Sequence, residues 1–342
     1  MNTVGVIANP IAGKDIRRLV SAASHTSDSS KIDIIRRAVI AACECGAERV
    51  LLAPDPHHLA RRAIDGLDVP AEVLDVAVDG HRHDTVAAAE AMWKRGVGVV
   101  IALGGDGTCR DVARGWPDVT MIAISTGTNN VYPTTIDATS AGSAAAFIAT
   151  TAMAVAPLVR RSKRLLVTIE DDDRHEVIDD LALVDVALID TTFVGSRAVL
   201  DPRTVRAVVA AIAHPASTGL SSIAGRVHPV DRWEPGGVSV RLGDGGRGVR
   251  VPMSPGAFAT LDIVSVEAVA DGDSVVLRGP GVLAFDGERD HRLHATSSAR
   301  VRVDAGGPLL VDVPATLLAA AANGLFDARR TVASHLEDDH AH

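Results

Sequence analysis

Apolar and polar residues alternate along the first part of the chain in a pattern that predicts strands joined by helices. Short runs rich in β-branched residues are expected to form strands, and the stretches between them carry the Ala-rich periodicity of helices. The predicted strands span Thr3–Ala8, Arg49–Ala53, Glu72–Val76, Val97–Leu103 and Thr120–Ile124. The predicted helices span Asp15–Ala23, Ile32–Cys43, His58–Ile64, Asp84–Lys94 and Ser140–Val155, and Asp84 is the expected N-cap of the fourth. This alternation indicates an open parallel sheet of the Rossmann-like α/β class.

The pattern changes from about Lys163 onward, where short Val-rich runs are separated by Gly, Pro and Asp. Such turn-separated strands predict an antiparallel β sandwich. The predicted strands span Gly236–Leu242, Ala259–Val269, Ser274–Leu277, Val282–Phe285 and Arg300–Asp304. One helix is expected among them, from Asp201–Pro202 to about Ala213, because Pro is favoured just inside a helix start. A last helix is predicted over Pro314–Leu325, before a charged tail.

The composition fits two folded domains and narrows the range of partners. The chain has 342 residues, 47% of them apolar, which suffices for two separate cores. We expect an α/β domain over residues 1–160, a β-rich domain over 161–313, and a C-terminal helix and tail over 314–342; whether that helix returns to the first domain stays open. The net charge of −9 gives no overall support for binding nucleic acid or an acidic membrane. A basic run, Arg160–Arg164, is expected to be a solvated surface.

Targeting and cysteine features predict a cytoplasmic protein. No apolar run approaches the ~18 residues of a membrane span, and Met1–Ile7 lacks the basic lead-in of a signal peptide. The three cysteines, an odd number in a long chain, fit a reducing compartment. His57 with His58, and His81 with His83, have no third ligand at a convincing spacing, so no metal-binding cluster is predicted.

The most informative stretch is Gly104–Thr108, in which three glycines follow an apolar strand and precede a predicted helix. Glycines let the backbone approach a ligand and adopt positive φ, and the free N–H groups at a helix start bind anions, so phosphate is the expected ligand. Thr108 and Asp111 have the spacing of a capping box. Asp106 has no such structural role in the pattern. We therefore predict that it takes a proton from an attacking hydroxyl or holds Mg²⁺ in phosphoryl transfer.

Other glycine motifs do not fit their spacing. Arg110 stands where the third glycine of a dinucleotide fingerprint belongs. Around Gly13–Lys14, Ala8 and Asp15 replace the first glycine and the hydroxyl residue of a Walker loop. The loop at Gly104–Thr108 is therefore not a dinucleotide fingerprint, and Gly13–Lys14 is not part of a Walker loop.

Three loops resemble those of the superfamily shared by NAD kinases, diacylglycerol kinases and sphingosine kinases. Gly104-Gly-Asp-Gly-Thr108 resembles the superfamily signature. Asn9-Pro-Ile-Ala-Gly13 resembles the N-P-x-x-G of the lipid-kinase branch, and Gly127-Thr-Asn-Asn130 resembles its G-T-x-N-D. The second half is similar to the ATP-NAD-kinase-like group that includes the acetoin-catabolism X proteins. Residues 193–198, 219–225 and 285–288 carry that similarity.

This resemblance implies an NAD-kinase-like kinase of two domains, with ATP and Mg²⁺ on the α/β domain and the acceptor between the domains. Asp106 matches the family's proposed base, and Asp286 and Glu288 match a D-G-E near the catalytic centre. The residues expected to bind nucleotide and phosphate are Asn9, Gly13, Lys14, Gly104, Gly105, Gly107, Thr108, Thr126, Gly127 and Thr128. Those expected to bind the acceptor are Asn129, Asn130, Asp185, Thr218, Gly219 and Ser221.

Three functions remain open at this point. The first is a kinase that transfers the γ-phosphoryl of ATP to a small-molecule hydroxyl, with NAD as the leading acceptor because the whole-chain similarity is to that branch. The second is a lipid or sphingoid-base kinase, motivated by the loops at Asn9–Gly13 and Gly127–Asn130. The third is a nucleotide-binding regulator without turnover, motivated by altered NAD motifs at Val184–Asp185 and Ser217–Ser221. The expected partners are a small-molecule acceptor and further copies of the chain in a homo-oligomer, and no nucleic acid or membrane.

Overall fold

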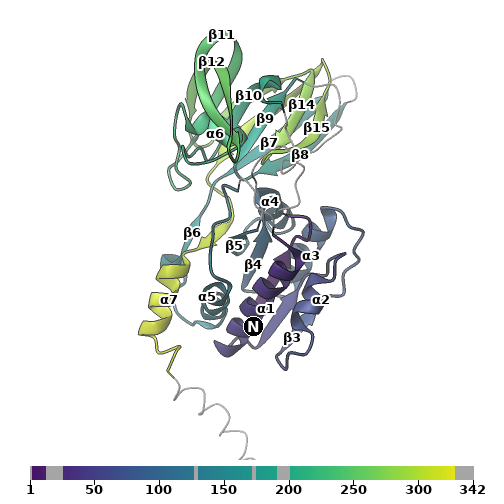
Figure 1. Ribbon diagram of the computed structural model, residues 1–342, viewed down its shortest axis with the longest axis vertical. Coiled ribbons are helices and arrows are strands. Elements are labelled where there is room, and N and C mark those ends of the chain that lie inside the picture. Colours follow the sequence, from purple (N-terminus) through teal and green to yellow (C-terminus); the bar gives the residue numbers. More distant parts are fainter. Residues whose placement is uncertain (1, 13–25, 127–129, 172–174, 191–200, 328–342) are drawn as a thin grey trace, which may run out of the picture.

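The structure is a computed structural model in which an α/β half and a β-rich half lie end to end (Figure 1). It describes residues 2–12, 26–126, 130–171, 175–190 and 201–327, apart from the side chain of Arg289. The helix predicted over 15–23, the family-like segment 193–198 and the tail from residue 335 lie outside the described residues.

The α/β half is built on a seven-stranded sheet with the order β3-β2-β1-β4-β5-β17-β6. Its strands are β1 (Thr3–Ala8), β2 (Arg49–Leu52), β3 (Ala71–Val73), β4 (Val99–Gly104), β5 (Thr120–Ser125), β6 (Val159–Arg161) and β17 (Leu309–Val311). All neighbours are parallel except β17 and β6. The prediction of an open parallel sheet is confirmed, and each of the five strands predicted in this region is present.

Helices cover both faces of this sheet. They are α1 (Asp28–Glu44), α2 (Leu59–Ile64), α3 (His83–Lys94), α4 (Asp106–Gly115) and α5 (Ala138–Thr150). Side chains of β4 alternate between the two faces, as successive residues of a strand must. Val99 and Ile101 share a core with α1 and α5, whereas Val100 and Ala102 share one with α3 and α4. Asp84 is not the N-cap of α3, because the helix already begins at His83; its carboxylate instead accepts hydrogen bonds from the N–H groups of Asp79 and Gly80.

The β-rich half is a sandwich of two antiparallel sheets, as predicted. The six-stranded sheet has the order β12-β11-β10-β9-β14-β15, and the four-stranded sheet has the order β13-β16-β7-β8. The strands are β7 (Arg164–Asp171), β8 (Glu176–Ala182), β9 (Asp185–Ile189), β10 (Val205–Ala210), β11 (Gly237–Ser254), β12 (Ala257–Val269), β13 (Ser274–Arg278), β14 (Gly281–Phe285), β15 (Glu288–Leu293) and β16 (Ser297–Asp304). Their facing side chains form one apolar core between the sheets. A short helix, α6 (Leu220–Gly225), covers the outer face.

The helix predicted from Asp201 to Ala213 is wrong. Only a single 3-10 turn, η3 (Pro202–Thr204), follows the capping Asp201, and the chain then enters β10, which pairs with β9 and β11. The capping signal at Asp201 is nevertheless present in the structure, since its carboxylate accepts the N–H of Arg203. However, a Val-rich run flanked by two strands gains both ladders of hydrogen bonds and burial on both faces, and this tertiary context overrides the local signal.

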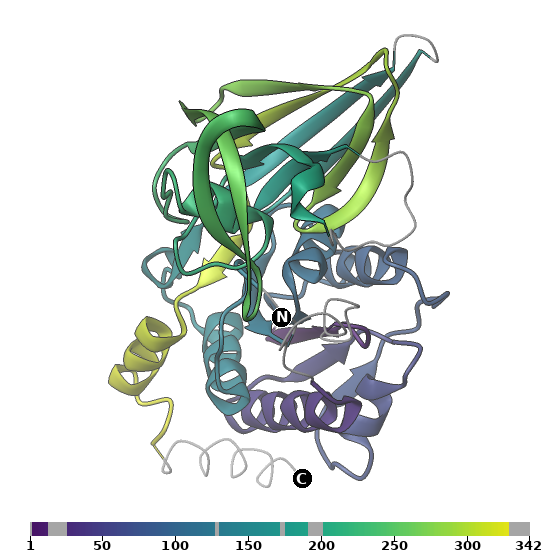
Figure 2. The ribbon, with the colours of Figure 1, turned by 45° about the horizontal axis from the view of Figure 1, so that its top comes forward.

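The chain leaves the first sheet after β6 and returns to it at β17. A second 3-10 turn, η2 (Ala156–Leu158), leads into β6, and β17 inserts between β5 and β6. The last helix, α7 (Val313–Ala322), packs beside α5 and is the yellow helix in Figure 2. The β-rich strands β7–β16 are therefore inserted between two strands of the first sheet. Among the helices described, none is long and apolar enough to span a membrane.

Candidate functional site

Three loops meet where β1, β4 and β5 end. The N–H of Asn9 donates to the carbonyl of Leu103 at 2.9 Å, and the N–H of Thr126 donates to the carbonyl of Gly104 at 3.0 Å. These bonds bring the ends of the three strands together at the carboxyl edge of the sheet, the edge at which open α/β sheets bind ligands.

The glycine loop turns directly from β4 into α4, with Gly105 as the N-cap. The expected capping box is wrong, because Thr108 already lies inside the helix and its hydroxyl accepts a hydrogen bond from the Asn9 amide at 2.9 Å. Gly105 has a negative φ of −108°, so positive φ is not the reason for glycine here. Close approach is the reason, since a Cβ at Gly104 would collide with Thr108 and one at Gly105 would lie 2.9 Å from Asn130 Oδ1.

A buried lysine that sequence reasoning missed holds the loop after β1 in place. Lys31, on α1, is wholly buried. Its Nζ donates to the carbonyl oxygens of Asn9, Pro10 and Ala12 at 3.1, 2.7 and 2.7 Å. The Asn9 Oδ1 accepts the N–H of Ile11, which tightens the loop further. No local signal could have found Lys31, because its partners are about twenty residues away in the sequence.

Asp106 has a structural role that the sequence pattern did not reveal. Its buried carboxylate accepts hydrogen bonds from the backbone N–H groups of Val131, at 3.0 Å, and Tyr132, at 2.8 Å. Burial and the neighbouring Asp286 carboxylate raise the pKa of Asp106 to about 7. The prediction that Asp106 lacks a structural partner is therefore wrong, because the carboxylate also anchors the loop after β5.

Asp286 approaches the same place from the β-rich half. Asp286 and Gly287 form the two-residue turn between β14 and β15, both with positive φ, as a tight hairpin turn requires. The buried Asp286 carboxylate accepts the N–H groups of Leu183 and Val184 at 3.1 and 2.8 Å, and the N–H of Asp185 at 3.3 Å. Burial raises the pKa of Asp286. The fold thus sets two buried carboxyl groups, one from each half, within electrostatic reach of each other.

A wholly buried arginine offsets this negative charge. Arg110 Nη1 donates to the Phe285 carbonyl at 3.0 Å, so the helix after the glycine loop contacts the Asp286 hairpin directly. Burial alone would lower the pKa of Arg110, but the nearby carboxylates, that of Asp286 foremost, raise it. The sequence offers no local signal for this role of Arg110, because its partner, Phe285, is 175 residues away.

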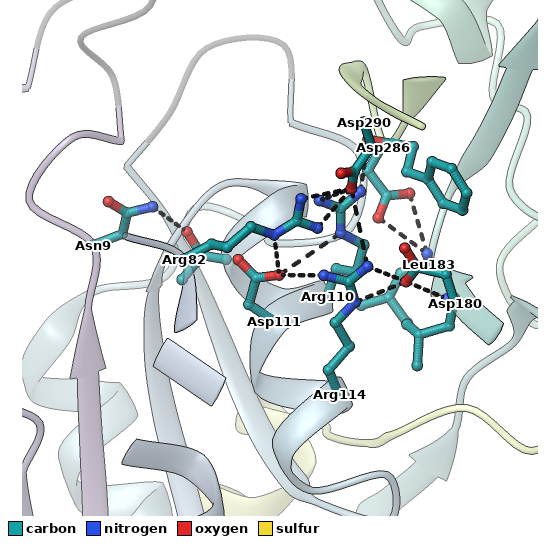
Figure 3. Close-up of polar contacts among 12 residues, drawn as sticks. Asn9, Arg82, Arg110, Asp111, Arg114, Asp180, Leu183, Asp286 and Asp290 are labelled. Carbon is teal, nitrogen blue, oxygen red and sulfur yellow. Dashed lines mark hydrogen bonds and ion pairs between the residues drawn. The ribbon is translucent and has the colours of Figure 1, made fainter. Parts of the chain in front are cut away.

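A network of charged side chains links the two halves beside this hairpin (Figure 3). Arg82, at the start of α3, donates through Nη1 and Nη2 to the Asp290 carboxylate at 2.6 and 2.7 Å. Arg114 Nε, on α4, donates to the Asp180 carboxylate at 2.8 Å. The Nε2 of His291 also lies 2.8 Å from Asp180. Asp180, Asp290 and His291 have metal-like spacing, but the two guanidinium groups beside the carboxylates would repel a cation.

A small cavity of about 80 Å³ opens beside the glycine loop. Asn9, Arg82, Gly107, Asp111 and Glu288 are among its lining residues. The Glu288 carboxylate is so close to Gly107 that a Cβ there would touch it at 3.4 Å. Burial raises the pKa of Asp111 to about 6, against the opposing charge of Arg110. The cavity is therefore lined by the N-terminus of α4, the loop after β1, the start of α3 and the first residue of β15.

The remaining predicted site residues differ in whether they contact the glycine loop and the strands beside it. Asn130 donates to the Ser125 hydroxyl at 2.7 Å, and the buried hydroxyl of Thr126 has no hydrogen-bond partner among the residues described. Gly219 caps α6, which packs against β10 and β11. In the described part of the chain, no hydrogen bond or ion pair joins Thr218, Gly219 or Ser221 to the glycine loop. The predicted residues outside the described part are Gly13, Lys14, Gly127, Thr128 and Asn129.

Comparison with known proteins gives this architecture a class. The family model of the ATP-NAD kinase N-terminal domain matches residues 4–152, and that of the acetoin catabolism protein X C-terminal domain matches residues 163–306. Yeast NADH kinase, solved in complex with NADH, superposes with a TM-score of 0.55 over 90% of this chain and 82% of that chain, at 13% identity. An α/β half with this glycine loop, joined to the β sandwich, thus defines a protein with the NAD-kinase fold.

One curated relative shares the sequence over most of its length. Acetoin catabolism protein X of Cupriavidus necator is 37% identical over 300 residues, which are 84% of this chain and 83% of that protein. The chain belongs to the acetoin catabolism protein X family.

Proposed function

We propose that the protein is a kinase that transfers the γ-phosphoryl group of ATP to a hydroxyl of a small molecule. The observation that carries the proposal is the position of Asp106, a buried carboxyl group in the first turn of α4 beside the glycine loop. The N-terminus of a helix offers backbone N–H groups and a partial positive charge to phosphate. The match of residues 4–152 to the ATP-NAD kinase domain supports ATP as the donor.

The small cavity beside Gly107 fits a polyphosphate only together with a cation. Asp111 and Glu288 line it together with Arg82. The Asp111 Oδ1 lies 3.5 to 3.9 Å from nitrogen atoms of Arg82, Arg110 and Arg114, so guanidinium groups already balance its charge. The Glu288 carboxylate lies beside Gly107 of the glycine loop, where it would repel phosphate unless a cation lay between them. Mg²⁺ prefers carboxylate oxygens, so Glu288 is the residue that would hold Mg²⁺, which when bound neutralises charge on the transferring phosphoryl oxygens.

Asp106 is proposed as the general base. A carboxyl group with a pKa of about 7 exchanges protons near neutral pH, where a general base works best. The N–H groups of Val131 and Tyr132 hold it in one orientation. Asp286 raises the affinity of Asp106 for the proton that it takes from the acceptor hydroxyl. Positioning and charge neutralisation would supply most of the remaining rate, as in other phosphoryl transfers.

The acceptor is proposed to be a water-soluble hydroxyl compound, and NAD is the first candidate. The family model of the N-terminal half favours NAD, whereas the name of the Cupriavidus relative points to acetoin catabolism. Acetoin itself carries a hydroxyl group, so it belongs in the same test. Asp185, a proposed acceptor-binding residue, donates its N–H to the Asp286 carboxylate at 3.3 Å. A homo-oligomer remains the proposed assembly.

The test is a transfer assay with γ-labelled ATP, Mg²⁺ and a panel of acceptors that includes NAD, acetoin, polyols and diacylglycerol micelles. We expect label on a water-soluble acceptor with the wild type and with Asp201→Asn, an exposed carboxylate outside the site. Transfer to diacylglycerol alone would identify a lipid kinase instead. ATP binding without transfer to any acceptor would identify a regulator, and either result would contradict the proposal.

A further inference from the structure

A second and larger cavity, of about 790 Å³, lies between the first sheet and residues 232–233 of the β-rich half. Its floor is apolar and comes from Met121 and Ala123 on β5 and from Leu310 on β17. Arg232 and Trp233, from the segment between α6 and β11, form one wall. We call this space the Trp233 cavity. It shares no lining residue with the small cavity beside Gly107, and its volume is that of a small-molecule site.

Two arginines give the Trp233 cavity a positive wall. The guanidinium carbon of Arg160 lies 4.2 Å from the centre of the Trp233 ring, and that of Arg232 lies 5.8 Å from it. Among the described residues, no carboxylate forms an ion pair with either arginine. Arg160 belongs to the basic run that was expected to be a solvated surface, but its side chain lines the cavity.

In the described part of the chain, the two carboxylates that line the cavity form no ion pair with these arginines, and both cap helices. Asp137 accepts the N–H of Thr139 at the start of α5 and pairs with Arg37 at 3.0 Å. Asp312 accepts the N–H of Ala315 at the start of α7. The Arg232 charge also acts on the buried Asp106 carboxylate. An apolar floor, an indole ring and two guanidinium groups together favour a ligand with a flat apolar body and a negative charge.

Residues of the Trp233 cavity contact the segment that holds the proposed base, Asp106. Arg232 Nη2 donates to the carbonyl of Val131 at 2.5 Å. The N–H groups of Val131 and Tyr132 are the donors that hold Asp106, and the ring of Tyr132 lines the cavity. An anion that binds the Arg232 guanidinium therefore competes with the carbonyl oxygen of Val131, whose N–H group helps to orient Asp106.

We propose that the Trp233 cavity binds a small organic anion with an aromatic or similarly flat body, held by Arg160 and Arg232 against Trp233. We further propose that its binding is transmitted to Asp106 through the Arg232–Val131 hydrogen bond. This site goes beyond the proposed kinase activity and does not depend on it, because binding can be measured without ATP or acceptor.

The test uses 8-anilinonaphthalene-1-sulfonate, a fluorescent aromatic anion, titrated into the full chain. We expect saturable binding of one probe per chain. Arg160→Ala should weaken it about 10-fold, the loss expected when one charge-assisted hydrogen bond disappears, and Trp233→Leu should weaken it at least as much. Arg250 and Phe258 form a matched control, since they make a similar stacked pair, at 5.3 Å, outside the cavity. Arg250→Ala and Phe258→Leu should leave the affinity unchanged.

Several outcomes would overturn the assignment. Arg160 is exposed, so Arg160→Ala should not affect folding. Unchanged probe affinity in this variant would contradict the proposed site. An equal loss of affinity in the Arg250 and Phe258 controls would contradict it as well. Competitive displacement of the probe by Mg-ATP would make the cavity part of the nucleotide site. Hydrogen exchange tests the coupling. Probe at a concentration that saturates the wild type but not Arg160→Ala should alter exchange at the Val131 and Tyr132 amides more in the wild type than in the variant, and no change in the wild type would refute the coupling.

Discussion

At Asp106 one carboxyl group serves both the local fold and the proposed chemistry. It orders the loop after β5 by accepting two backbone N–H groups, and it faces a second buried carboxyl group, that of Asp286. The two requirements are compatible because the hydrogen bonds stabilise the ionised form while burial and Asp286 oppose it. The resulting pKa, about 7, lies far above that of an exposed aspartate.

The role of Asp106 as a base predicts how a substitution at this residue changes activity. In Asp106→Asn the side-chain oxygen can still accept the N–H groups of Val131 and Tyr132, so the loop should keep its shape. The amide cannot take a proton, and turnover should fall by ~10²–10⁴, the usual contribution of a general base. Steady-state kinetics with the labelled-ATP assay measures this, and Asp201→Asn serves as the control. Near-wild-type turnover would remove Asp106 from the mechanism.

The raised pKa of Asp106 also predicts how stability depends on pH. In the unfolded chain the carboxyl group ionises near pH ~4, whereas in the folded chain it ionises near pH 7, so between these values the folded state binds the extra proton. The contribution of Asp106 to the free energy of unfolding should therefore be fully present below pH ~4 and be lost as the pH rises through 7, by on the order of 1–4 kcal/mol.

Urea unfolding of the wild type and Asp106→Asn at pH 5, 6, 7 and 8 isolates the contribution of Asp106 together with its coupling to Asp286. The wild type should lose stability relative to the variant as the pH rises. A difference that stays constant over this range would show that the carboxyl group is ionised throughout.

At the scale of elements, α1 and α4 build the site by holding loops that belong to other strands. Lys31 of α1 gathers three carbonyl oxygens of the loop after β1. Arg110 of α4 holds the Phe285 carbonyl at the end of β14. In each case a long basic side chain satisfies backbone acceptors that burial would otherwise leave without a donor, which is costly in a folded protein.

Lys31→Met is predicted to loosen the loop after β1. The substitution keeps the length of the side chain but removes the donor, so buried carbonyl groups lose their partner. We expect thermal unfolding to show a loss on the order of 2 kcal/mol, together with a higher KM for ATP. Lys94→Met, which changes an exposed lysine on α3, is the matched control and should alter neither quantity. An unchanged KM in Lys31→Met would separate this loop from nucleotide binding.

At the scale of the whole molecule, the charged network fixes how the two halves meet. Arg82 and Arg114 come from the α/β half, and Asp180 and Asp290 come from the β-rich half. Burial opposes the charge of Asp180, but hydrogen bonds from His291 and Arg114 outweigh it and hold the pKa of that carboxyl group well below its usual range. The stability that Asp180 contributes is therefore present above pH ~4 and is lost as the pH falls further.

Asp180→Asn should destabilise the folded protein by ~1.5–3 kcal/mol, since it weakens the charge-assisted hydrogen bonds from Arg114 and His291. Asp111 and Asp290 still lie near Arg114 and limit the loss. The matched control is Asp118→Asn, which removes an exposed ion pair with Arg161 and should cost at most ~1 kcal/mol. Calorimetric unfolding of both variants at pH 7 makes the comparison. Equal, small losses in the two variants would show that the network does not stabilise the contact between the halves.

Elements with local signals can be predicted from the sequence, whereas features that depend on distant partners emerge only when the chain folds. The strands around β4 and the glycine loop follow from apolar periodicity and from the small size of Gly104 and Gly105, which depend on neighbouring residues. Whether Val205–Ala210 forms a helix or the central strand β10 depends on β9 and β11. The meeting of Asp106 with Asp286, some 180 residues apart, depends on the insertion of the β sandwich between β6 and β17, because burial and charge act through space and periodicity acts along the chain.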